Sequence, residues 1–165
     1  MSNKLHAAAI EQVLTCLTDH PTRLATITDG LTPAQLRTPP AADEWSINDV
    51  LAHLRSCADV WGGYINRILN EDEPHFRAIS PRTYIKRTNY PDLEFAPSFA
   101  AFRTQRADLL AILEPLPIEA WSRIATVTKN DKVTDRSVLD YAQSICDHEG
   151  EHMGQLAEIA ARLRT

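Results

Sequence analysis

The sequence predicts an all-α fold, a single-domain four-helix bundle with long crossover connections. Four segments carry apolar side chains every three to four residues, which is the period of an amphipathic helix. Most of the ten prolines stand in the links between these segments. A chain of 165 residues suits one core, so we expect one domain over residues 1–165.

The first helix is expected over about residues 4–29. Pro21 removes a backbone donor midway and predicts a kink, and Gly30 ends the helix. The second helix starts after Ser46, which can cap the amide of Asp49, a carboxylate that the helix dipole favours in the first turn. The expected buried faces are Leu5, Ile10, Val13, Leu14, Leu17, Leu24 and Ile27 in the first helix and Val50, Leu54, Cys57, Trp61, Tyr64 and Ile68 in the second.

The third helix has Pro97 near its first turn, and Pro115 and Pro117 end it. The fourth helix is expected over about residues 135–163. The links at residues 70–96 and 121–135 are long enough for neighbouring helices to run parallel as well as antiparallel, and residues 124–127 are expected to be extended. The expected buried faces are Phe99, Phe102, Leu109, Leu110 and Leu113 in the third helix and Val138, Tyr141, Ile145, His152, Leu156, Ile159 and Leu163 in the fourth.

Composition and charge exclude several classes of partner. The net charge is −5 and the basic residues are scattered, which argues against binding nucleic acid or an anionic membrane surface. No apolar run is long enough to cross a bilayer, and residues 1–10 do not resemble a secretion signal. Cys16, Cys57 and Cys146 show no paired spacing, so we expect reduced cysteines and a cytoplasmic protein.

Three of the six histidines fall on or beside predicted buried faces. His148 and His152 are four residues apart, so they are stacked neighbours on one helix face. His53 has a similar position on the second helix. Imidazole is the commonest protein ligand of zinc-like metals, and three such ligands can hold one ion with a coordination position left open. The sequence therefore predicts a metal-binding bundle.

Two other interpretations of these histidines stay open. Residues 148–152 also match His-Glu-x-x-His, the zinc-protease motif. Few residues follow His152 to supply a third ligand, however, and Gln155 and Glu158 stand where the metzincin extension requires glycine and histidine. In the second interpretation each histidine simply forms a hydrogen bond within the core. We assign no role to His6, His20 or His75.

Several other side chains are candidates for the same site. Glu149 faces the bundle interior, where it could orient an imidazole, act as a base on water, or extend to the open end of the bundle. For Arg106 we favour an ion pair with Glu149 or Asp59 over a substrate-carboxylate clamp. The remaining candidates are Tyr64 and Gln155 as substrate contacts and Cys57 as a soft ligand, each with a simple packing or capping role as the alternative.

Three motifs in order resemble the DinB/YfiT-like superfamily. EWSINDVLAHL at residues 44–54 resembles the family's "Trp-Ser … His-Leu" segment, and FRTQRADLL at residues 102–110 resembles its "Phe…Arg…Leu-Leu" pattern. HEGEHMGQ at residues 148–155 resembles its "His-(Asp/Glu)-x-x-His-x-x-Gln". The resemblance implies a four-helix bundle, often a homodimer, that holds a divalent metal such as zinc or nickel on His53, His148 and His152.

Members of that superfamily include mycothiol-dependent maleylpyruvate isomerases and bacillithiol S-transferases. The resemblance thus implies a thiol S-transferase in which the metal activates a low-molecular-weight thiol for attack on an electrophile. A metal-dependent hydrolase with the same site is a further alternative. A different class is a non-catalytic bundle whose metal only joins two helices, or a binding module in a stress response.

Overall fold

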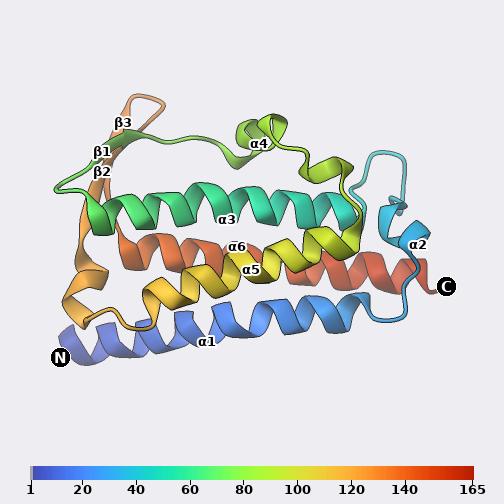
Figure 1. The fold of residues 1–165 in the computed structure, drawn as a ribbon, viewed down its shortest axis with the longest axis horizontal. Coiled ribbons are helices and arrows are strands. Elements are labelled where there is room, and N and C mark those ends of the chain that lie inside the picture. The colour runs from blue at the N-terminus through green and yellow to red at the C-terminus, as the bar shows by residue number, and fades with distance from the viewer. Residues whose placement is uncertain (1) are drawn as a thin grey trace.

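The computed structural model describes residues 2–165, except for the side chains of residues 2, 3 and 5. The predicted core position of Leu5 therefore lies outside the described part. Four long helices form the bundle: α1 (Ser2–Thr28), α3 (Ile47–Asn70), α5 (Phe95–Leu113) and α6 (Val138–Leu163) (Figure 1). The links contain α2 (Pro33–Arg37) and α4 (Pro81–Tyr84), together with the 3-10 turns η1 (Ile85–Arg87), η2 (Tyr90–Asp92) and η3 (Ile118–Ser122).

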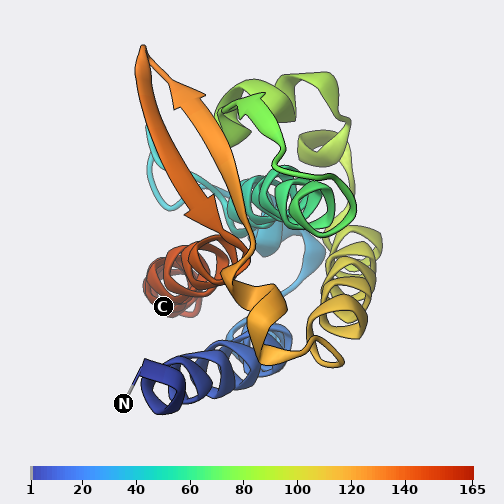
Figure 2. The same ribbon diagram turned by 90° about the vertical axis from the view of Figure 1, so that its left-hand side faces the viewer.

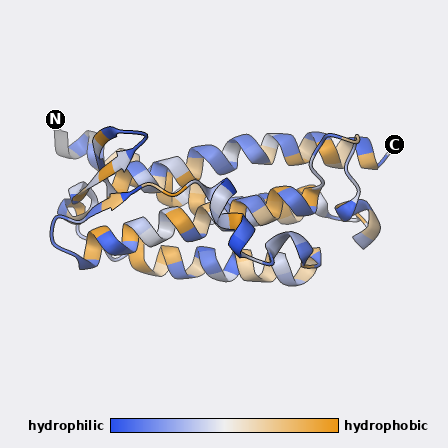
Figure 3. Cartoon of the chain, turned by 90° about the horizontal axis from the view of Figure 1, so that it is seen from above, coloured by the Kyte–Doolittle hydropathy of each residue, from blue (hydrophilic) through white to orange (hydrophobic). Residues whose placement is uncertain are grey.

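The end-on view in Figure 2 shows how the long helices are arranged. Both α1 and α3 pack against α5 and against α6, so α1 and α3 lie diagonally opposite each other. Figure 3 shows hydrophobic and hydrophilic residues alternating along each long helix, as amphipathic helices require. The predicted four-helix bundle is therefore confirmed. None of the helices described is both long and apolar enough to cross a membrane.

Local capping explains where two of the long helices begin. The hydroxyl of Ser46 accepts a hydrogen bond from the backbone amide of Asp49, as predicted, and the Asp49 side chain accepts one from the Ser46 amide in return. Ser137 and Asp140 form the same reciprocal pair at the start of α6. Helix α6 thus begins at residue 138, a few residues later than predicted, because a strand occupies the preceding segment.

A small sheet at one end of the bundle was only partly predicted. Its strands are β1 (His75–Arg77), β2 (Ile124–Lys129) and β3 (Lys132–Ser137), with β2 parallel to β1 and antiparallel to β3. The extended segment expected at residues 124–127 is part of β2. Asn130 and Asp131 form the turn between β2 and β3 with positive φ angles of 46° and 62°, which favours the tight hairpin.

The core consists of two apolar clusters separated by a polar layer. The cluster next to the sheet includes Leu17, Val60, Leu109 and Ile145, and the other includes Leu24, Leu54, Phe102 and Met153. Between these positions each long helix contributes a buried polar side chain: His20, Ser56, Arg106 and Glu149. Because buried polar groups must be paired, His20, Arg106 and Glu149 join α1, α5 and α6 in this layer, while Ser56 bonds the Ala52 carbonyl of its own helix.

The expectation of three reduced cysteines is wrong for two of them. Cys16 of α1 and Cys146 of α6 form a disulfide, with their Cα atoms 6.1 Å apart, and Cys57 is free and buried. Spacing along the chain could not reveal this pair, because 130 residues separate its members. The cysteine count therefore no longer supports the prediction of a cytoplasmic location.

Candidate metal centre

Three imidazole nitrogens converge at the interface between α3 and α6. Nε2 of His148 lies 3.2 Å from Nε2 of His53 and 3.3 Å from Nε2 of His152. A single imidazole nitrogen carries either one proton or one lone pair, so hydrogen bonding does not explain two such neighbours. Ligand nitrogens sit about 2.0–2.1 Å from zinc, which places two of them roughly 3.3 Å apart in tetrahedral geometry. The three histidines therefore fit a shared divalent cation.

A hydrogen bond sets the tautomer of His152. Its Nδ1 lies 2.7 Å from Oε1 of Gln155, so Nδ1 donates the proton and Nε2 keeps its lone pair for a ligand. Gln155 was predicted one turn beyond His152, as a contact to bound water or a cap at the edge of the site. The structure places it against the imidazole itself.

Burial keeps two of the ligands neutral. Desolvation, followed by the neighbouring His148 and His152, lowers the pKa of His53 to about 4. Burial also lowers the pKa of His148. Metals bind the neutral imidazole, so at neutral pH these side chains are already in the form that coordinates.

Cys57 lies one turn beyond His53 and borders the same site. Its Sγ is 3.6 Å from Nε2 of His53, and the ligand atoms of His53, Cys57 and His148 all lie within 4.8 Å of one another. Burial raises the pKa of the Cys57 thiol to about 12 in the absence of a metal. Cys57 is thus within reach of an ion held by the histidines, but coordination would require loss of a firmly held proton.

Two tryptophans form walls around the histidines. The Trp45 ring centroid lies 5.2 Å from that of His53 and 6.4 Å from that of His152, and Trp61 packs edge-on against His148 at 5.2 Å. Trp45 had entered the prediction only as part of the family motif, and Trp61 as a core residue. Both instead border the site, where aromatic rings exclude water and restrict the imidazoles.

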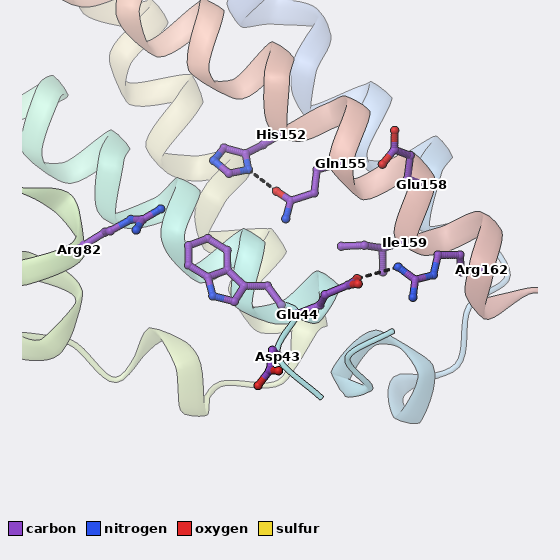
Figure 4. Close-up of a pocket in the computed structure, with 9 residues that line it drawn as sticks. Asp43, Glu44, Arg82, His152, Gln155, Glu158, Ile159 and Arg162 are labelled. Carbon is purple, nitrogen blue, oxygen red and sulfur yellow. Dashed lines mark hydrogen bonds and ion pairs between the residues drawn. The ribbon is translucent and has the colours of Figure 1, made fainter. Parts of the chain in front are cut away.

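The histidines are reached through two cavities on either side of Trp45. The larger, of about 590 Å³, contains His152 and is shown in Figure 4; it is lined by Asp43, Glu44, Trp45, Arg82, His152, Gln155, Glu158, Ile159 and Arg162. The smaller, of about 370 Å³, is lined by Trp45, Asp49, His53, Arg82, Ile85 and Pro91. Arg82 lies in the long link before α5, where no periodic pattern marked it as a site residue. A small molecule can therefore approach the histidines from the surface.

Glu149 belongs to a separate buried group. It is 1% exposed, and its two oxygens accept hydrogen bonds from Nδ1 of His20 at 2.8 Å and from the guanidinium of Arg106. Arg106 also donates to the carbonyl of Leu17 at 2.8 Å. The ion pair favoured for Arg106 is therefore present. Since both oxygens of Glu149 are occupied, the structure gives no free carboxylate for the base role proposed from sequence.

His20 is a residue that the sequence analysis missed. It is 3% exposed and completes the polar group around Glu149, although we had assigned it no role. A signal was present, because His20 follows Leu17 by three residues and precedes Leu24 by four, on the predicted apolar face.

The sequence placed His152 at the centre of the buried face of α6, and this was wrong. The fully buried line runs through Ile145, Glu149 and Met153, while His152 is half-buried at its edge. Glu149 and Met153 thus replace His152 at the centre of the buried face, while Ile145 and Leu156 are buried as predicted. The carboxylate of Glu149 is paired with Arg106 and His20 in the middle of α6, and His152 lies at the edge and faces the cavity.

Tyr64 is placed away from the histidine cavities. Its ring packs against Phe76 at 4.4 Å and Tyr141 at 5.3 Å, and its hydroxyl accepts a hydrogen bond from the amide of Ile79. It borders another cavity, of about 430 Å³, beneath the hairpin. Among the candidates from sequence, the structure thus brings His53, His148, His152, Cys57 and Gln155 together, and it groups Glu149 with Arg106.

Comparison with known proteins agrees with this geometry. The family model of the DinB superfamily matches residues 17–156, a span that includes all three histidines. The chain is also similar to YfiT from Bacillus subtilis, described as a probable metal-dependent hydrolase with an unusual four-helix bundle topology. That similarity has a TM-score of 0.78 over 93% of this chain and 87% of YfiT, at 18% sequence identity, and so shows the fold. No curated protein matches the chain. Because the family model spans most of the sequence, the chain belongs to the DinB superfamily.

Proposed function

We propose that this protein is a metal-dependent thiol S-transferase in which His53, His148 and His152 hold a divalent cation. The observation that carries the proposal is that Nε2 of His148 lies 3.2 Å from that of His53 and 3.3 Å from that of His152, beside two cavities. When bound, a cation such as zinc or nickel would supply the positive charge that stabilises a thiolate over a thiol. The low-molecular-weight thiol and the electrophile would enter through the cavities.

The chain's own residues prepare the site for this chemistry. Gln155 holds the proton of His152 on Nδ1, and Trp45 and Trp61 restrict the rings and limit water. A thiol has an ordinary pKa of about 8.5, so a neighbouring cation is sufficient to ionise it near neutral pH without a dedicated base. Ionisation without a base suits this site, because the Glu149 carboxylate is bonded to His20 and Arg106 and is not free to accept the thiol proton.

The position of Glu149 also argues against a protease of the His-Glu-x-x-His type. In that class the glutamate of the motif activates water. Here both oxygens of that glutamate, Glu149, already accept hydrogen bonds from His20 and Arg106. A metal-dependent hydrolase of another kind is the nearer alternative, since YfiT is described as a probable metal-dependent hydrolase. It would use the same three histidines and the same cavities.

A second candidate function is a non-catalytic bundle whose metal joins α3 to α6. The observation that favours it is Cys57, whose Sγ lies 3.6 Å from Nε2 of His53 and could close the coordination shell. The two cavities that reach the histidines favour the enzyme.

The expected homodimer and cytoplasmic location remain proposals. Sedimentation analysis would test whether the protein is a homodimer.

Elemental analysis of untagged protein tests the metal site. We expect one divalent ion per chain in the parent and loss of most of it in His53→Ala and His152→Ala. His75→Ala is the matched control, since His75 is exposed on β1 and bonds only Thr128. Unchanged metal content in both site variants would remove the proposal.

Turnover then separates the functions. Parent protein, loaded with metal or treated with chelator, is assayed for consumption of small thiols with an aromatic halide and for hydrolysis of esters without thiol. Metal-dependent thiol consumption supports the transferase, and metal-dependent ester hydrolysis without thiol supports the hydrolase. Neither activity, with one tightly bound ion, supports the non-catalytic bundle.

A further inference from the structure

Arg82 is a cation at the mouth of the histidine site that has no carboxylate partner. It is exposed on α4 and lines both cavities that reach the histidines. Its guanidinium lies over the Trp45 ring, 5.6 Å from the centroid. Figure 4 shows the Arg82 side chain pointing toward the cavity that holds His152. Within residues 2–165 no ion pair or hydrogen bond of its side chain is found.

The carboxylates nearest to this arginine are engaged or lie apart from it. Glu44 accepts from Arg162 at 2.7 Å, and Asp49 accepts from the amide and hydroxyl of Ser46 in the helix cap. Two acidic residues of the larger cavity remain, Asp43 and Glu158. In Figure 4 Glu158 lies at the Arg162 end of the cavity and Asp43 at its lower edge, while Arg82 lies at the opposite end from Arg162.

Trp45 connects Arg82 to the metal ligands. One ring contacts the guanidinium and both His53 and His152. A molecule that places one atom on an ion at the histidines can therefore extend its other end along the Trp45 ring toward the guanidinium. Guanidinium forms paired hydrogen bonds with a carboxylate and repels an ammonium group.

We propose that Arg82 binds an anionic group of the substrate, so that the site selects small thiols bearing a carboxylate over neutral or amine-bearing thiols of the same size. This inference rests on the proposed function, because it assumes that a thiol binds at the histidine-held metal. It adds the chemical class of that thiol and names the residue that recognises it.

Thiol binding to the full-length protein loaded with cobalt(II) tests this inference without an activity assay. The probes are 3-mercaptopropionate, 2-mercaptoethanol and cysteamine, which differ chiefly in charge, and the readout is the sulfur-to-cobalt absorption band during titration. For the parent protein we expect 3-mercaptopropionate to bind about tenfold more tightly than 2-mercaptoethanol, as one charge-assisted contact provides. Cysteamine should bind most weakly.

Substitutions then assign the preference to Arg82. Arg82→Met should abolish the tenfold preference while changing 2-mercaptoethanol binding less than about twofold, and Arg82→Lys should retain part of it. Arg87→Met is the matched control, because Arg87 is exposed on η1 and lines neither cavity. An unchanged d–d spectrum of cobalt in each variant shows that the histidine site is intact.

The outcomes separate the two proposals. Equal binding of all three thiols, or a preference that survives Arg82→Met, overturns this inference and leaves the thiol site standing. Bound cobalt that produces no sulfur band with any thiol overturns the proposed transferase and, with it, the role of Arg82.

Discussion

Nδ1 of His20 lies 2.8 Å from Oε2 of Glu149, a contact that joins α1 to α6 across 129 residues of sequence. Arg106 of α5 donates to the other oxygen of the same carboxylate. Glu149 is next to His148 in the chain, so this buried polar group positions the helix that supplies two of the three proposed ligands. The buried core thereby adjoins the candidate metal site along α6.

Removing Glu149 should strongly destabilise the protein. Glu149→Leu leaves the guanidinium of Arg106, which is 3% exposed, without its counter-charge, and we expect a loss of about 3–5 kcal/mol in the free energy of unfolding. The double variant Glu149→Leu with Arg106→Met should recover most of this loss, since it removes both charges. Urea unfolding measures the free energy of unfolding of the single and the double variant. Glu151→Gln, on the exposed face of α6, is the control and should change stability by less than about 0.5 kcal/mol.

The metal-free protein should lose stability as the pH falls from about 6.5 toward 4. Burial and the neighbouring histidines lower the pKa of His53 from 6.5 to about 4 in the folded state. Between these values the unfolded chain holds the additional proton, so acidification favours unfolding. The urea midpoint of chelator-treated protein at several pH values measures this. The urea midpoint of His53→Gln should depend less steeply on pH. If parent and variant had the same slope of urea midpoint against pH, His53 would not be the residue responsible.

Gln155 should influence metal affinity without contacting the ion. Its Oε1 accepts the Nδ1 proton of His152 at 2.7 Å, and loss of such a partner typically weakens metal binding by about 10–100-fold. We therefore expect this loss in Gln155→Leu and a smaller one in Gln155→Glu, which keeps an acceptor. Competition with a zinc chelator measures the affinity. Equal affinity in parent and Gln155→Leu would show that the hydrogen bond does not orient the ligand.

Cys57→Ala should bind as much metal as the parent protein. The three imidazoles alone match the separation of ligands on one ion, and burial raises the pKa of the Cys57 thiol to about 12. In cobalt-loaded parent protein without added thiol, we expect no sulfur-to-cobalt band. A strong band that disappears in Cys57→Ala would show a closed shell and favour the non-catalytic bundle.

Reduction of the Cys16–Cys146 disulfide should lower stability by roughly 2–4 kcal/mol, because the bond closes a long loop in the unfolded chain. Guanidinium unfolding with and without dithiothreitol measures the difference. Cys16→Ser, which cannot form the disulfide, should have the same lowered stability with and without dithiothreitol. Cys57→Ser keeps the disulfide and should respond to the reductant as the parent does. A parent protein whose stability does not change with reductant would contradict the presence of the disulfide.

Local sequence patterns determined the helices and most of the candidate metal site. Helix periodicity and capping are encoded within a few residues, which is why the bundle and the capping of the Asp49 amide by Ser46 were predicted correctly. The spacing of His148 and His152 is equally local. Adding His53 required only the expectation that two apolar faces meet, and the structure brings these three nitrogens together.

The tertiary structure alone decided which distant groups pair. The disulfide, the contact of His20 with Glu149, and the position of Arg82 over Trp45 each depend on how separate segments pack, and periodicity within one helix contains no such information. Packing also decided which residue lies at the centre of the buried face of α6, because a carboxylate with two buried partners is more stable inside the bundle than an imidazole that faces a cavity. The burial of Glu149 leaves His148 and His152 directed toward His53, where a cation can bind.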